Sequence, residues 1–128
     1  MGKKLLIIIV LLIVSCTIMK VEAEEVKGNK AIRAIIGEAS GEGYTGMVAV
    51  ACAIRNRGTL KGVYGQYAKH VDKEPQWVWG LAKKAWKESK NVDIVNGGDH
   101  WESTDFPVPS WAKEMTVTKR VGKHIFYK

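Results

Sequence analysis

The sequence predicts one mostly helical α+β domain with a small β element. Apolar residues occur at helical spacing in residues 31–39 and in an unbroken run in residues 47–54. A third helical stretch follows Pro75, and β-branched and aromatic residues are frequent in 115–128. These patterns predict three helices and then a hairpin, and a length of 128 residues suggests one domain of ordinary size.

The first predicted helix covers residues 31–39. Its apolar residues Ile32, Ile35, Ile36 and Ala39 recur at the i, i+3, i+4, i+7 spacing of an amphipathic helix. The glycine-rich sequence SGEG follows and predicts the end of this helix.

The second predicted helix begins near Thr45 as its N-cap and contains eight apolar residues in a row, Met47–Ile54. A buried strand is the alternative interpretation of such a run. Three alanines within it, two arginines after it and Gly58 as the C-cap favour a helix. A helix that is apolar on all sides is expected at the centre of the domain.

The third predicted helix starts near Pro75, which suits a first turn, and continues to about Lys90. Trp77 and Trp86 stand at helical spacings within it, so we expect both in the core. Residues 91–110 show no regular pattern. The segment 115–128 predicts a small hairpin or strand pair.

The chain starts with a basic segment, MGKK, and an apolar run, Leu5–Ser15. This run is too short for a comfortable membrane span and has the length of a signal-peptide core. The sequence IVSC, ending at Cys16, resembles a bacterial lipobox, in which the cysteine is lipidated. The sequence VEA, ending at Ala23, resembles an ordinary cleavage site, and an uncleaved anchor from Leu5 to Met19 is a third alternative.

These features divide the chain into a signal peptide or lipoprotein signal (1–23), a polar linker (24–30) and a folded domain (31–128). We expect an exported protein of the cell envelope or extracellular space, in contact with the membrane through its signal or a lipid anchor. If Cys16 is lipidated or removed, Cys52 is left alone in an apolar setting, where an inert buried thiol is expected.

The formal net charge of +7 favours an anionic partner such as the bacterial cell wall, lipid head groups or nucleic acid. Nucleic acid is disfavoured because the basic residues are dispersed along the chain and an export signal is present. The histidines His70, His100 and His124 are scattered, and the chain has no H-E-x-x-H or C-x-x-C motif. We therefore expect no metal and no cofactor. We also expect a monomer.

Glu38 is the candidate catalytic residue. It lies beside the apolar face near the end of the first helix, with the small residues Ala31 and Ala34 as neighbours. Partial burial, the negative helix end and the lack of a nearby cation all disfavour its charged form. We expect a carboxyl group that can hold a proton near neutral pH, as a general acid must. The alternative is a helix-terminal glutamate that points into water.

Two segments carry a family resemblance: AIRAIIGEASGEGYTGMVAVACAIRNR (31–57) and VGKHIFYK (121–128). Together they resemble the spore cortex-lytic cell-wall hydrolases, which combine an E-A-x-G-E motif, an alanine- and valine-rich helix ending in N-R, and a closing G-x-H-x-F-Y segment. The resemblance implies a lysozyme-like domain that cleaves peptidoglycan, often as a lytic transglycosylase. Its catalytic acid falls on Glu38.

The same resemblance suggests further site residues. Glu42 falls on the second glutamate of the motif, Asn56 on the asparagine that ends the second helix, and His124, Phe126 and Tyr127 on the closing segment. From the residues alone, Glu42 is interpreted as a surface or turn residue. His124 is expected to bind substrate or to orient Glu38, with a purely structural role as the alternative.

Aromatic faces are expected to hold sugar rings by stacking, and Trp101, Tyr44 and Tyr127 are the candidates because they lie in or beside loops and motifs. Trp111 is left open between core and substrate contact.

An ordinary glycosidase needs two carboxyl groups, and none of Asp99, Glu102 and Asp105 stands out as the second. In a lytic transglycosylase the 6-hydroxyl of N-acetylmuramic acid attacks its own C1, so one glutamate can serve twice. The sequence therefore favours a transglycosylase over a hydrolase. The rival interpretation is a non-catalytic exported or lipid-anchored module that binds peptidoglycan.

Overall fold

The computed structural model describes residues 28–128. The predicted signal segment, including Cys16, lies outside the described residues. The first helix covers residues 28–39 of the described part. The elements that follow are α2 (Gly43–Arg57), η1 (Tyr64–Tyr67), η2 (Lys69–Lys73), α3 (Gln76–Glu88), β1 (His100–Ser103), η3 (Ser110–Glu114), β2 (Val117–Val121) and β3 (His124–Tyr127).

The helix 28–39 is longer than predicted. Residues 28–30, assigned to the linker from their polarity, are already helical. Asn29 and Lys30 are exposed, and a polar helix turn is stable in that position because its side chains face water. Further along, Ile32, Ile35, Ile36 and Ala39 are all buried, which confirms the predicted amphipathic face.

The α2 helix is the centre of the domain, as predicted. Every residue from Gly46 to Ile54 is buried, so the alternative of a buried strand is wrong. The helix begins at Gly43 with Glu42 in the N-cap position, three residues before the predicted cap Thr45. At its other end, Gly58 adopts a left-handed conformation (φ 71°) and its N–H bonds the Ile54 carbonyl, as expected of a C-cap glycine.

The α3 helix packs against α2 through Val78, Ala82 and Ala85. The prediction that Trp77 is a core residue is wrong, because this side chain in the first turn of α3 is 67% exposed. Trp86 does pack against the core, and the Arg55 guanidinium lies 3.6 Å from the centre of its ring.

The sheet has three antiparallel strands in the order β1-β3-β2. The predicted hairpin is present as β2 and β3, with Gly122 (φ 54°) in the turn between them. The third strand, β1, lies in the segment predicted to be irregular. It has only four residues, and each is half-buried, so no apolar alternation marks it in the sequence.

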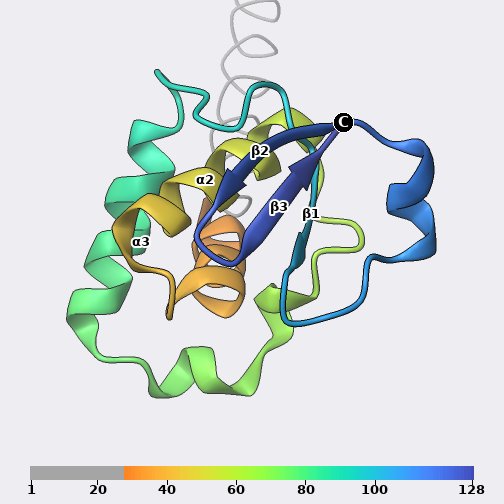
Figure 1. Ribbon diagram of the computed structural model, residues 1–128. Coiled ribbons are helices and arrows are strands. Elements are labelled where there is room, and N and C mark those ends of the chain that lie inside the picture. Colours follow the sequence, from red (N-terminus) through yellow and green to blue (C-terminus); the bar gives the residue numbers. More distant parts are fainter. Residues whose placement is uncertain (1–27) are drawn as a thin grey trace, which may run out of the picture.

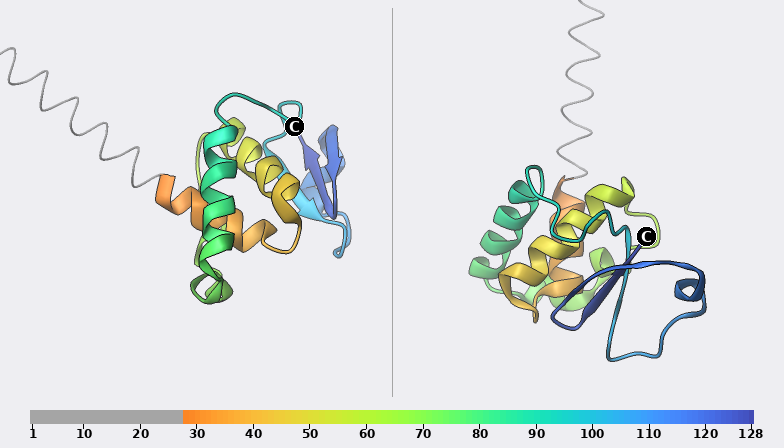
Figure 2. Two further views of the ribbon diagram at one scale, coloured as in Figure 1. Left: turned by 90° about the vertical axis from the view of Figure 1, so that its left-hand side faces the viewer. Right: turned by 45° about the horizontal axis from the view of Figure 1, so that its top comes forward.

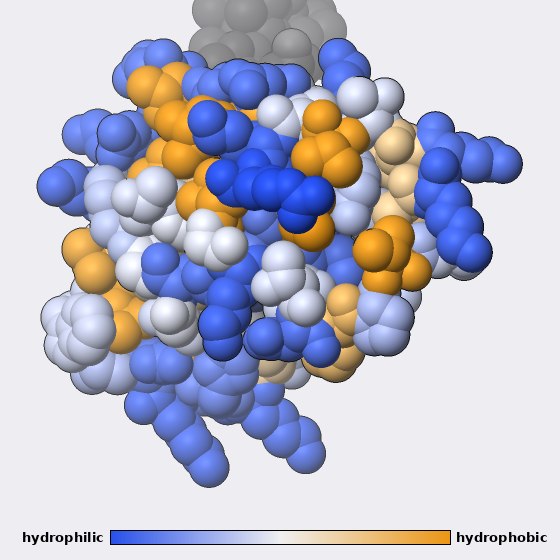
Figure 3. Space-filling model, in the orientation of Figure 1, coloured by the Kyte–Doolittle hydropathy of each residue, from blue (hydrophilic) through white to orange (hydrophobic). Residues whose placement is uncertain are grey.

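The helices form one layer and the sheet packs beside α2 (Figures 1 and 2). Register pairs Trp101 with Phe126 and Ser103 with His124, and Phe126 is fully buried in the core. On the face seen in Figure 3, hydrophilic side chains separate the apolar ones into small patches. No helix within residues 28–128 has the length and apolar character that spanning a bilayer requires.

The helix 28–39 touches η1 backbone to backbone. A Cβ atom on Gly37 would lie 1.9 Å from the carbonyl oxygen of Gly65, so only glycine permits this approach. Arg33 holds the same junction, because its Nε donates to the Gln66 carbonyl and its Nη1 lies 2.7 Å from Asp72 Oδ1.

Gly37→Ala is expected to destabilise the domain by about 2–3 kcal/mol, because the added methyl group forces the helix 28–39 away from η1. The matched control is Gly80→Ala in α3, where an added Cβ meets nothing within 4 Å. Gly80→Ala should stabilise the domain by about 0.5–1 kcal/mol, because alanine has a higher helix propensity than glycine. Urea unfolding midpoints measure both, and a Gly37→Ala protein as stable as the parent would contradict the close contact.

Candidate active site

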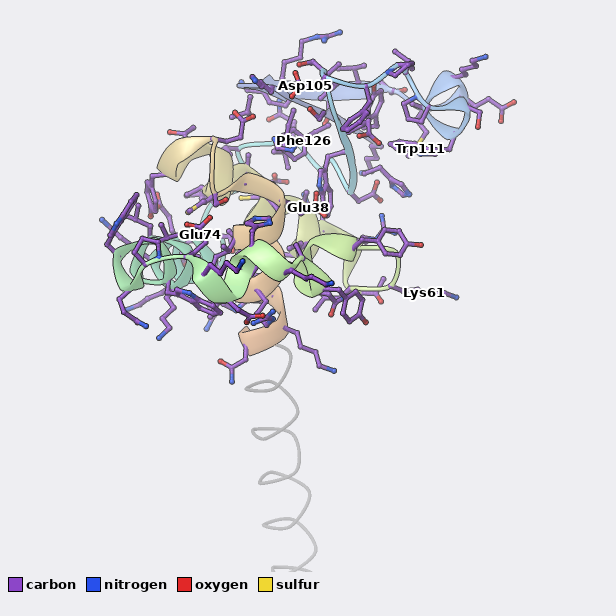
Figure 4. The ribbon with its side chains drawn as sticks, turned by 90° about the horizontal axis from the view of Figure 1, so that it is seen from below. Glu38, Lys61, Glu74, Asp105, Trp111 and Phe126 are labelled. Atoms are coloured by element: carbon purple, nitrogen blue, oxygen red, sulfur yellow. The ribbon has the colours of Figure 1, made fainter. Side chains whose placement is uncertain are left out.

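A cleft of about 860 Å³ opens between the helices and the sheet. Figure 4 shows Glu38 between the helical part and the layer that carries Asp105, Phe126 and Trp111. The lining comes from the end of the helix 28–39 and the turn after it, from residues 57 and 62–64, from β1 and the residues after it, and from positions 111, 123 and 124. The predicted catalytic glutamate therefore lies in this cleft.

Glu38 is half-buried in the last turn of its helix, and both carboxylate oxygens accept a hydrogen bond. The backbone N–H of Gly65 donates to Oε1 at 2.9 Å, and the indole N–H of Trp101 donates to Oε2 at 3.3 Å. Gly65 can approach so closely because it lacks a Cβ, which would lie 2.7 Å from Glu38 Cγ. The alternative of a glutamate in open water is wrong.

These two donors change the electrostatic argument made from the sequence. Burial and the helix end disfavour the anion, but N–H groups aimed at both oxygens stabilise it. The structure thus shows the contacts that stabilise the anion, which the sequence could not show. Trp101, predicted as a sugar-stacking residue, contacts the glutamate itself through its indole N–H.

Glu42 lines the cleft and connects its two walls. Its Oε2 accepts the backbone N–H of Lys123 at 3.2 Å, in the turn between β2 and β3. Gly122 favours this contact, because it adopts a positive φ of 54° and a Cβ there would lie 2.4 Å from the same oxygen. Glu42, interpreted from the sequence as a surface or turn residue, therefore joins the start of α2 to the hairpin turn.

His124 also lines the cleft, on β3 beside that turn, and is only 6% exposed. Its Nδ1 is buried with no hydrogen-bond partner within the described residues, and its ring packs near Phe126. Arg57 lines the cleft as well and is not among the predicted site residues. Its Nη1 donates to the Asp99 carbonyl at 3.3 Å and its Nη2 to the Lys61 carbonyl at 2.8 Å.

Three predicted substrate contacts do not line the cleft. The Tyr44 hydroxyl bonds Glu88 on the far side of α2, because the helix turns this ring toward α3. Asn56 uses its side-chain amide to bind the Gly98 carbonyl (3.0 Å) and Asp93 (3.2 Å), which fastens a loop. Tyr127 is only 4% exposed, because the sheet register places it behind other side chains.

Of the three acidic candidates in the segment 91–110, Glu102 and Asp105 line the cleft and Asp99 does not. Glu102 Oε1 accepts the N–H of Ser103 at 3.0 Å, and Asp105 lies 3.7 Å from Lys123 Nζ. Across residues 28–128, no group of three or more histidine, cysteine, aspartate or glutamate side chains is arranged to hold a metal ion.

Trp111, left open between core and substrate contact, lines the cleft. Three aromatic residues missed by the sequence interpretation line it as well: Tyr64, which is 77% exposed, His100 and Phe106. They lie in 3-10 turns, a loop and a four-residue strand. Such segments carry no periodic signal, so only tertiary structure identifies them.

A helical layer, a small antiparallel sheet and a glutamate at the end of a helix, in the cleft between the two, are features of the lysozyme-like class of domain. Within this class, the chain is homologous to the spore cortex-lytic enzymes and has the fold of the SleB catalytic domain. The predicted fold and the family resemblance are thereby confirmed.

No protein-family model matches the chain. The spore cortex-lytic enzyme of Oceanobacillus iheyensis is 32% identical over 108 residues, and the match covers 74% of this chain and 39% of that protein. The catalytic domain of the Bacillus cereus SleB protein matches with a TM-score of 0.58 and 28% identity, covering 77% of this chain and 86% of that one. The catalytic domain of the germination-specific lytic transglycosylase SleB from Bacillus anthracis gives a TM-score of 0.60 and 27% identity, covering 79% and 93%.

The position of Tyr44 outside the cleft leads to a test. Its hydrogen bond to Glu88, with smaller effects of burial and of the Glu88 charge, raises the pKa of Tyr44 from 10.0 to about 12. Glu88→Gln keeps an acceptor but removes the charge, so the pKa of Tyr44 should fall toward 10.0. Ring chemical shifts followed against pH measure this. Glu114→Gln on η3 is the control, and a parent Tyr44 that titrates near 10.0 would contradict the contact.

Proposed function

We propose that the chain cleaves the glycan strands of peptidoglycan as a lytic transglycosylase, with Glu38 as the acid and then the base. The observation that carries the proposal is the Glu38 carboxyl group, held in a cleft by the Gly65 and Trp101 N–H groups. Homology to spore cortex-lytic enzymes and the fold of SleB, described as a lytic transglycosylase, support it.

In the first step, protonated Glu38 gives its proton to the oxygen that bridges two sugars, and the bond from that oxygen to C1 of N-acetylmuramic acid breaks. Oε1 is fixed by the backbone of Gly65, whereas the contact from Trp101 to Oε2 is longer, so Oε2 is the oxygen assigned to proton transfer. The leaving sugar departs with a new hydroxyl group. The two N–H donors then stabilise the carboxylate that remains.

In the second step, the Glu38 carboxylate takes the proton of the 6-hydroxyl of the same N-acetylmuramic acid. The freed oxygen attacks C1 and closes a 1,6-anhydro ring. Glu38 is thereby protonated again, and no water is consumed. One carboxyl group is sufficient for the cycle, whereas direct hydrolysis needs a second group to activate water.

Substrate contacts are assigned to the predicted residues that line the cleft, namely Glu42, Trp101 and His124. His124 and Trp101 line the same cleft as Glu38, and the Trp101 indole N–H contacts the Glu38 carboxyl group. Tyr44, Asn56 and Tyr127 are given no direct contact, because they do not line the cleft. Export by residues 1–23, with either a lipid on Cys16 or cleavage after Ala23, and a monomeric state belong to the same proposal.

The second candidate function is a non-catalytic module that grips peptidoglycan in the same cleft. The exposed aromatic side chains that line the cleft would serve binding equally well. The two candidates differ in whether Glu38 performs chemistry.

Glu38→Gln should lower the rate of peptidoglycan solubilisation by about 100- to 10,000-fold, because the amide cannot donate a catalytic proton. The measurement is the release of soluble muropeptides from purified peptidoglycan, resolved by mass spectrometry. Glu74→Gln is the control, since Glu74 lies outside the cleft (Figure 4). Binding without product in the parent and in Glu38→Gln alike would favour the module.

The products distinguish transglycosylation from hydrolysis. In water labelled with heavy oxygen, the new muramic ends should carry no label and should lack one water relative to hydrolysis products. The reason is that the attacking oxygen comes from the sugar itself. Mass spectra of the muropeptides measure both features. Labelled reducing ends would identify a hydrolase and would direct attention to Glu102 or Asp105 as the second carboxyl group.

A further inference from the structure

Trp111 is a cleft residue to which the proposed chemistry gives no role. It lies on the short η3 turn and its side chain is 41% exposed, so a large apolar ring faces the cleft. An exposed tryptophan at such a position costs hydrophobic free energy unless a ligand or partner covers it.

The Trp111 ring is held in place on two sides. Tyr127 packs edge-on against it, with ring centres 5.5 Å apart and planes at 81°. His100 lies 5.5 Å away at 47°. Both arrangements are among those that aromatic pairs prefer, so the indole is oriented before any ligand arrives.

The supporting histidine is itself fixed. Asp99 Oδ1 lies 2.8 Å from His100 Nδ1, and the Asp99 carbonyl accepts the Arg57 guanidinium at 3.3 Å. The chain of contacts from Arg57 through Asp99 and His100 to Trp111 ties the aromatic ring to the helical wall of the cleft. A ring that is exposed, oriented and tethered in this way has the properties of a binding platform.

Trp111 and Glu38 line the same cleft at different places. The indole beside the Glu38 carboxyl is that of Trp101. In Figure 4 Trp111 lies above and to the right of Glu38, in the layer that also carries Asp105. A glycan strand is long enough to occupy both positions, with the cleaved bond at Glu38 and another ring of the same strand at Trp111.

We propose that Trp111 is the stacking platform of a second subsite, which binds a pyranose ring of the glycan strand away from the cleaved bond. The apolar C–H face of the sugar covers the indole, and its hydroxyl groups remain in water. Tyr127 acts through Trp111 as a positioning residue, because its ring packs edge-on against the indole. This subsite rests on the proposed function, because it takes the same strand.

The test measures affinity and kinetics with soluble glycan strands freed of their peptides. In a Glu38→Gln background, Trp111→Ala should weaken strand binding about tenfold, equal to about 1.4 kcal/mol. Trp111→Tyr, which keeps an aromatic face, should restore most of the affinity. With Glu38 intact, Trp111→Ala should raise KM and leave kcat nearly unchanged, because the subsite binds ground and transition states alike.

The matched control is Trp77→Ala, which removes an exposed tryptophan on α3 outside the cleft and should change neither Kd nor KM. Thermal unfolding of each variant separates loss of binding from loss of fold. Unchanged affinity in Trp111→Ala, or a fall confined to kcat, would overturn the subsite. A parent that binds strands through Trp111 without cleaving them would reject the proposed reaction and keep the subsite, whereas a parent that binds no strand would reject both.

Discussion

The site depends on one close approach, that of the Gly65 backbone to the helix 28–39. Only because Gly37 and Gly65 lack side chains can η1 lie against this helix closely enough for the Gly65 N–H to reach Glu38 Oε1. A backbone donor cannot rotate away as a side chain can, so the carboxyl group is oriented by the fold itself. Arg33 and its contacts with Gln66 and Asp72 hold this junction from outside.

The buried helix α2 brings the second donor to the glutamate. It is apolar on all sides, packs against α3, and also contacts β1 and β2. The sheet can therefore lie beside the end of the helix 28–39, and Trp101 on β1 reaches a glutamate 63 positions earlier in the chain. Burial of α2 is thus the energetic basis for bringing together Glu38 and a hydrogen-bond partner that is distant in the sequence.

The sequence predicts those features that local patterns determine. Apolar periodicity identified the helices and placed Glu38 on a shoulder of the first one, and β-branched residues identified the hairpin. The strand β1 and the 3-10 turn η1 were not predicted, because four half-buried residues and a 3-10 turn have no periodic signal. Tyr44 was misplaced for a related reason: its helix could be predicted, but the direction of the ring depends on packing against α3.

Two polar tethers fix the width of the cleft. At one end of β3, the turn N–H of Lys123 bonds Glu42, and beyond the other end, Arg57 bonds the Asp99 carbonyl, while the Asp99 N–H bonds the Tyr127 carbonyl. Because β1 runs antiparallel to β3, Trp101 lies between these tethers. The helical wall and the sheet wall are therefore joined on both sides of the glutamate. A cleft joined in this way keeps its donors in place, which suits the proposed cycle, in which a single carboxyl group acts twice.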